Sequence, residues 1–200
     1  MDNKVDHLYA AIKLYLTRVS QESFDPKEAD RYIQILTFST NLEHCGDIID
    51  KNLMELAAKK IRKQEHFSKT GFSEIKDFHH KVIGNLKLAQ TVFISEDIDL
   101  AKRLIAEKKT IRNAETESSN QHFNRLREGH TQTLATSSLH LDLIRDLRRI
   151  NSYAASIGYA VLENLEMQAR NKRNEAQGLD KERSSGIDNA YESDEIEEPS

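Results

Sequence analysis

Apolar side chains recur at steps of three and four along most of the chain, which is the spacing of one face of an α-helix. The pattern divides the first 170 residues into five amphipathic segments that are joined by short polar links. The predicted helices span residues 5–19, 26–63, 70–93, 96–128 and 131–170. Five long helices with short connections predict an all-α antiparallel bundle.

The second segment carries a strong helix-start signal. Asp25 is placed as an N-cap, Pro26 stands at the first helical position, and Glu28 completes the spacing of a capping box. Ser95 is the predicted cap of the fourth helix, and Gly129 is its predicted end. The sequence therefore marks the start of the second helix and both ends of the fourth.

The third segment has the most regular apolar spacing of the chain. Its predicted buried positions are Phe72, Ile75, His79, Val82, Leu86, Ala89 and Phe93. At such a position a histidine that hydrogen-bonds a neighbouring side chain is favoured over a metal ligand.

Charge is distributed unevenly along the chain. Residues 174–200 hold nine acids and two basic residues, a net −7, and since the whole chain carries −4, residues 1–173 carry +3. The acidic stretch also lacks apolar periodicity, so residues 169–200 are predicted to be a disordered tail. A nearly neutral body has no dense basic face, which excludes a nucleic-acid footprint.

The chain has one cysteine, Cys45, which rules out an internal disulfide and fits a reducing compartment. Its place beside the apolar stripe of the second helix predicts a small buried thiol. The longest apolar run is far shorter than the 18–20 residues or so of a membrane span. The N-terminus also lacks the pattern of a signal peptide. These features predict a cytoplasmic protein.

Two pairs of acids are the candidate chemical sites. Glu43 and Asp47 stand four residues apart on one predicted helix, and so do Asp142 and Asp146. Like charges at this spacing destabilise a helix by roughly 0.2–0.5 kcal/mol, unless a cation or a basic partner lies against them. Each pair is therefore either a metal site or an ion-pairing site. Asp142 and Asp146 have an arginine three residues beyond each of them.

The stretch from Asn41 to Asp47, NLEHCGD, resembles the motif of PhoU, the phosphate-uptake regulator family. Glu43 and Asp47 match its paired acids, and Gly46 matches its glycine. The run from Asp146 to Ser152 aligns with the same pattern. Residues 136–153 are especially similar to the PhoU-like C-terminal domain of bacterial sodium/phosphate cotransporters. The likeness covers about residues 1–168.

The resemblance implies a fold of two three-helix repeats, a partial first repeat at 1–66 and a second at 70–168. It also implies iron or zinc bound on the acidic motifs, whereas carboxylates by themselves favour hard cations such as magnesium. The second repeat departs from the motif, with Arg148 and Ser152 in place of the two acids. Its metal ligands would then be Asp142 and Asp146, and this site should be the weaker one.

For function, the resemblance implies a non-enzymatic regulatory domain in phosphate transport, at the inner face of the plasma membrane. Its partner would be a membrane phosphate transporter, and a homodimer is a further expected assembly. The missing first helix suggests the cytoplasmic tail of a longer protein. The alternative is a structural helical module that binds another protein and has no metal or phosphate role. A ferritin-like di-metal enzyme is disfavoured, because the sequence has no E-x-x-H motif.

Overall fold

The computed structural model describes residues 2–21 and 24–191. These residues form helices and their connections, and no strand occurs among them. The chain divides into two units, residues 1–162 and residues 163–200. Each unit is described on its own below.

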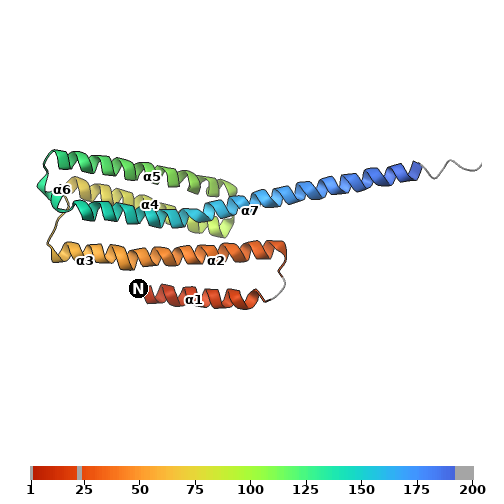
Figure 1. Ribbon diagram of the computed structural model, residues 1–200, viewed down its shortest axis with the longest axis horizontal. Helices are drawn as coiled ribbons and strands as arrows, with labels where there is room; N and C mark the ends of the chain where they lie inside the picture. The colour runs from red at the N-terminus through yellow and green to blue at the C-terminus, as the bar shows by residue number, and fades with distance from the viewer. Residues whose placement is uncertain (1, 22–23, 192–200) are drawn as a thin grey trace, which may run out of the picture. The chain divides into compact units, whose positions relative to one another are not determined.

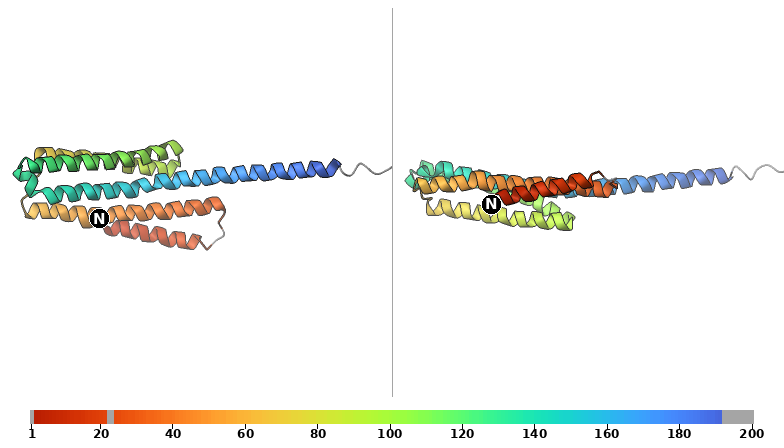
Figure 2. Two further views of the ribbon diagram at one scale, coloured as in Figure 1. Left: turned by 45° about the horizontal axis from the view of Figure 1, so that its top comes forward. Right: turned by 90° about the horizontal axis from the view of Figure 1, so that it is seen from below.

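The helices of the first unit run side by side as an antiparallel bundle (Figures 1 and 2), which confirms the predicted all-α fold. Their bounds are α1 Asp2–Val19, α2 Pro26–Asp47, η1 Ile48–Leu53, α3 Met54–Arg62, α4 Lys69–Ser95, α5 Ile98–Arg127, α6 Thr131–Ala135 and α7 Ser137–Tyr191. None of the described helices is long and apolar enough to cross a membrane.

Helices α2 and α3 form the single long segment that the sequence predicts, but a π-helical stretch, η1, joins them. The predicted capping box is present. The backbone N–H of Glu28 donates to Asp25 at 2.9 Å, and the N–H of Asp25 donates to the Glu28 carboxylate at 3.0 Å. Because η1 begins directly after Asp47, the regular helical register changes next to the acidic motif.

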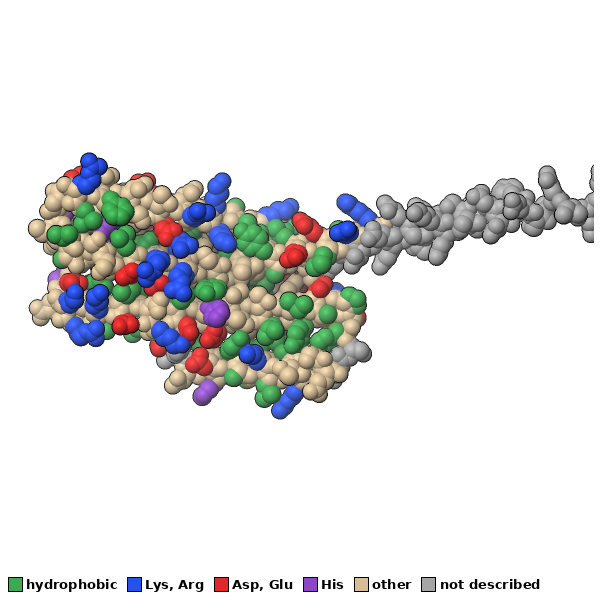
Figure 3. Space-filling view, viewed as in Figure 1, with side chains coloured by type: hydrophobic (Ala, Val, Ile, Leu, Met, Phe, Trp, Pro, Cys, Tyr) green, Lys and Arg blue, Asp and Glu red, His purple; other side chains and the backbone are tan. Residues whose placement is uncertain are grey.

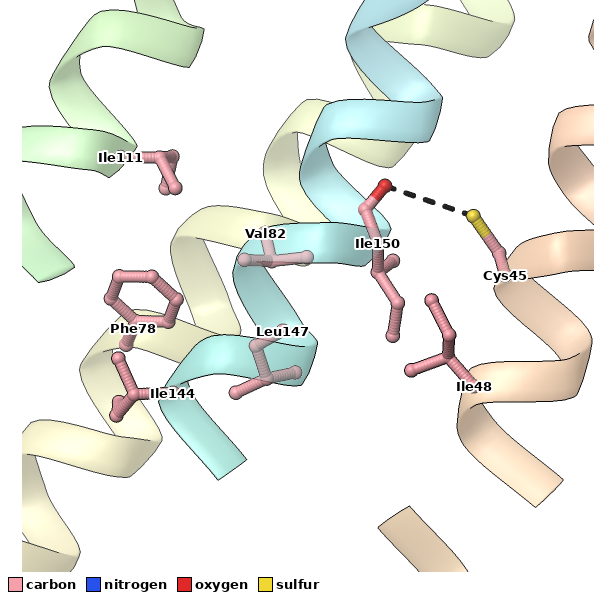
Figure 4. Packing of buried hydrophobic residues seen from close by; sticks show 8 residues of the cluster. All are labelled: Cys45, Ile48, Phe78, Val82, Ile111, Ile144, Leu147 and Ile150. Atoms are coloured by element: carbon pink, nitrogen blue, oxygen red, sulfur yellow. Dashed lines mark hydrogen bonds between the residues drawn. The ribbon is translucent and has the colours of Figure 1, made fainter. Parts of the chain in front are cut away.

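The core is built from α2, η1, α4, α5 and α7. Figure 4 shows one cluster in which Cys45 and Ile48 face Ile150 and Leu147 of α7. Burial raises the pKa of the Cys45 thiol to about 12, which confirms the predicted inert, buried cysteine. The other members are Phe78, Val82, Ile111 and Ile144.

Polar contacts fix the helices around this core. Arg31 of α2 donates to the Glu96 carboxylate at 2.7 Å and to the backbone oxygen of Phe93 at 3.1 Å. Its guanidinium also stacks 4.5 Å from the centre of the Phe93 ring. The end of α4 is thereby held against the start of α2.

The buried face of α4 and the start of α5 differ from the sequence prediction. The buried face of α4 contains Phe78 and Val82, while Phe72 and His79 are exposed. The predicted burial of Phe72 and His79 was wrong because the buried stripe of α4 passes through Phe78, one residue before His79. The N-cap of α5 is Asp97, whose carboxylate accepts from two backbone N–H groups, rather than Ser95.

The second unit continues α7 as far as Tyr191. A disordered tail is the sequence prediction from residue 169, so the helix at 169–191 differs from it. Apolar periodicity reports which residues are buried, not whether the backbone is helical, and this stretch has no proline to interrupt a helix. The last part of the predicted tail, residues 192–200, lies outside the described residues.

Candidate functional site

The structure adds a third acid to the Glu43–Asp47 pair. Asp6 of α1 lies against these two side chains of α2, and one carboxylate oxygen from each residue lies within 4.8 Å of the others. In the part of the chain that the structure describes, this is the one cluster of three potential acidic, histidine or cysteine ligands. We call these three residues the acidic face.

Packing of α1 on α2 brings the acidic face together. The hydroxyls of Tyr9 and Thr40 are hydrogen-bonded across the two helices at 3.0 Å. Six residues further along α2, Gly46 faces Val5, and a methyl group built at this glycine would lie 3.4 Å from the Val5 side chain. A small residue at position 46 thus lets α1 lie close enough for Asp6 to reach Glu43 and Asp47.

Two basic groups flank the acidic face. The Lys51 ammonium lies 2.5 Å from the Asp47 carboxylate, and the His44 ring lies 3.1 Å from Glu43. The side chains of Glu43 and Asp47 are 20% and 32% exposed, so they remain within reach of solvent. A cation that enters the face must therefore compete with Lys51 for Asp47.

The donor set of the acidic face suits a hard cation. Three carboxylates supply oxygen ligands, and the partial exposure leaves room for water to complete a coordination shell. Cys45 lies nearby in sequence but points into the core toward the backbone oxygen of Ile150, at 3.7 Å. The residues present fit an ion of the magnesium or iron class better than a thiolate-bound zinc site.

Asp6 was missed by the sequence prediction. It lies on the first predicted helix, next to the apolar positions Val5 and Leu8, and carries no motif of its own. The antiparallel pairing of the first two helices could have indicated Asp6. That pairing places the start of α1 opposite the end of α2, where the paired acids lie.

The second acidic pair has a different environment. Asp142 pairs with Arg145 at 2.9 Å, and Asp146, which is 1% exposed, pairs with Arg149 at 3.1 Å. Asp146 also accepts a hydrogen bond of 3.2 Å from Asn52 of η1. The two arginine contacts are the intrahelical ion pairs that the sequence offers as the alternative to a metal site. The described residues add no third acid to this pair.

The motif positions of the second repeat are occupied by a basic and a hydroxyl side chain. Arg148 of α7 donates to Glu115 of α5 at 2.8 Å. Asn151 is buried, and its side-chain oxygen accepts from Asn85 of α4 at 2.8 Å. The hydroxyl of Ser152 donates to the backbone of its own helix.

Comparison with known proteins shows a likeness to one family. Residues 75–161 match the family model of the PhoU domain. The matched segment comprises most of α4, all of α5 and α6, and the first half of α7. The acidic face lies before the matched residues, on α1 and α2.

Longer similarity comes from curated relatives. The "Putative inorganic phosphate export protein YjbB" of Escherichia coli strain K12 is 38% identical over 159 residues, 80% of this chain. The protein of the same name from Salmonella typhimurium is also 38% identical over 159 residues. The chain spans only 29% of the length of these relatives.

A solved structure confirms the fold beyond the matched PhoU domain. The crystal structure of PhoU from Pseudomonas aeruginosa superposes with a TM-score of 0.74 and covers 82% of this chain and 78% of its own. The two sequences are 19% identical, so the likeness concerns the helical arrangement. The likeness in fold covers more of the chain than the match at residues 75–161.

Proposed function

We propose that this chain is a non-enzymatic regulatory domain in phosphate transport and phosphate homeostasis. The observation that carries the proposal is the 38% identity, over 80% of the chain, to proteins named for inorganic phosphate export. The match of residues 75–161 to the PhoU domain model supports the same role. Its partner is a membrane phosphate transporter of the sodium-coupled type, in the same polypeptide or in another, and it works at the cytoplasmic face of the membrane.

The acidic face is the proposed control point of this domain. A metal ion, magnesium or iron, bound by Asp6, Glu43 and Asp47 ties α1 to α2. When the ion leaves, the three carboxylates repel one another, while Lys51 stays paired with Asp47. The position of α1 then depends on the metal, and this dependence is the signal passed to the transporter.

The test replaces Glu43 and Asp47 in the chromosomal gene, so that phosphate transport can be measured in living cells. The variant Glu43→Gln with Asp47→Asn keeps the side-chain shapes and removes two of three charges. We expect it to change phosphate transport across the membrane at least severalfold and to remove the metal found by elemental analysis of the natively purified protein. The matched control is Asp50→Asn, an exposed acid one turn away that lies outside the acidic face.

The second candidate function is a structural module that binds another protein through apolar side chains. Leu8, Leu14 and Tyr15 of α1 are 55–66% exposed, which is unusual for large apolar residues on one short helix. If the double variant leaves both phosphate transport and metal content unchanged, the regulatory proposal fails and this alternative is favoured.

A further inference from the structure

A polar cavity of about 450 Å³ opens between α5 and α7. Three cations line it, Lys108, Arg112 and Arg148, together with a single acid, Glu115. Three positive charges and one negative charge give a net +2. Figure 3 shows basic side chains gathered on this side of the first unit, over α5 and the first half of α7. We call this cavity the α5–α7 pocket.

The positive charge of the pocket is only partly compensated. Glu115 is engaged by Arg148 at 2.8 Å, and Lys108 lies 5.0 Å from the centre of the Tyr159 ring. Arg112 forms no ion pair with any acid whose side chain the structure describes. A planar guanidinium with free N–H groups is the side chain best suited to bind an oxyanion through two parallel hydrogen bonds.

The pocket also holds a buried donor without a partner. Asn151 is 1% exposed, and its oxygen is satisfied by Asn85, but its side-chain NH₂ group has no hydrogen-bond acceptor among the residues that the structure describes. A buried donor that stays unpaired is destabilising, because it has lost its hydrogen bonds to water. An oxygen atom placed in the pocket would satisfy it, next to the hydroxyls of Thr116 and Ser152.

The aligned motif positions carry different charges in the two repeats. The position of Glu43 in the first repeat is held by Arg148 in the second, and the position of Asp47 is held by Ser152. Where the first repeat presents carboxylates to a cation, the second presents a guanidinium, a hydroxyl and an amide. The two equivalent faces of the molecule are therefore suited to ligands of opposite charge.

We propose that the α5–α7 pocket binds a phosphate group, with Arg112 and Arg148 as charged donors and Asn151 as the buried neutral donor. Several converging donors match a tetrahedral oxyanion better than a planar carboxylate, which has only two oxygens to satisfy. The inference stands on the pocket itself and gives the proposed regulatory domain a direct phosphate-binding site. It is tested by binding to the purified chain, so its outcome is independent of the transport experiment on Glu43 and Asp47.

The experiment titrates the full chain with inorganic phosphate at constant ionic strength, by calorimetry. We expect saturable binding of one phosphate per chain. Arg112→Ala should weaken it at least tenfold, since a hydrogen bond to a charged group contributes roughly 1.5–3 kcal/mol. Ser152→Asp, which puts a carboxylate into the pocket, should abolish it. Circular dichroism and thermal melting establish that each variant is folded.

The matched control is Lys109→Ala, which removes one positive charge from an exposed neighbour on the same helix. It should change the dissociation constant less than twofold. A second arm measures sedimentation with vesicles of phosphatidylcholine alone or with phosphatidic acid. Binding to phosphatidic acid only, lost in Arg112→Ala and kept in Lys109→Ala, assigns the phosphate group to a lipid. No saturable binding in either arm, or equal losses in the two variants, overturns the proposal.

Discussion

At the residue scale, two buried imidazoles dominate one end of the bundle. The rings of His122 and His140 stack with centres 4.8 Å apart, and both are 1% exposed. Ser118 and Ser137 hydrogen-bond one ring each, and Glu74 lies 3.6 Å from His140. Burial, the neighbouring His122 and Arg125 together lower the pKa of His140 to about 4.

This lowered pKa predicts a loss of stability in mild acid. The unfolded chain protonates His140 near its ordinary pKa of 6.5, whereas the folded chain does so only near 4. Between these values the unfolded state binds more protons, so the stability present above pH 6.5 is lost as the pH falls toward 4. A shift of this size corresponds to about 3 kcal/mol.

Urea denaturation at pH 7 and at pH 4.5 measures the effect. The variant His140→Gln removes the titrating group, so the difference in unfolding free energy between wild type and variant should shrink as the pH falls. A difference that stays the same at the two pH values would refute the assignment to His140.

At the element scale, the close approach of α5 and α7 depends on a glycine. A methyl group built at Gly158 of α7 would lie 3.1 Å from the backbone oxygen of Ala101 and 3.1 Å from the Ile105 side chain. Backbone atoms of a packed helix cannot move aside cheaply. Gly158 is therefore a contact point between the two helices that line the α5–α7 pocket.

The substitution Gly158→Ala should destabilise the protein by about 1–2 kcal/mol, because overpacking exceeds the gain in helix propensity. The matched control is Gly84→Ala in the middle of α4, where the new methyl group meets nothing within 4 Å. That variant should be stabilised by up to about 1 kcal/mol. Thermal melting of both variants measures the two changes in stability. A stabilised Gly158→Ala variant would contradict the close packing of α5 and α7.

At the scale of the whole molecule, every buried apolar side chain that the structure describes lies in the first unit. Its buried apolar residues reach from Leu16 to Val161. The second unit, residues 163–200, holds the acidic stretch of the chain. The net negative charge and the buried apolar core thus lie in different parts of the sequence.

A chain shortened to residues 1–173 should therefore melt within about 2 °C of the full chain, since no residue of the described core is removed. Differential scanning calorimetry checks this, with both chains at the same concentration. A large drop in melting temperature would mean that the second unit contributes to the stability of the first. The net charge of the shortened chain should change from −4 to +3, which ion-exchange chromatography would confirm.

The sequence alone was sufficient for the order of the five long helices, but not for the π-helical stretch η1, for α6 as a separate helix or for α7 beyond residue 170. Apolar periodicity placed all five long helices, and the Asp25–Glu28 capping box located the start of α2, because these signals are local. The family motif was also readable, because it combines residue types at a fixed spacing. Periodicity could not phase α4 to the residue, so His79 was predicted buried in place of Phe78.

Only the tertiary structure decided what the candidate sites contain. Asp6 joins Glu43 and Asp47 because α1 packs on α2, and Asp146 is held by Asn52, 94 residues away in sequence. The α5–α7 pocket likewise combines side chains of two helices. A sequence pattern reports neighbours along one helix, three or four residues apart. Charges that meet between helices depend on the packing of the whole bundle, and no local spacing encodes it.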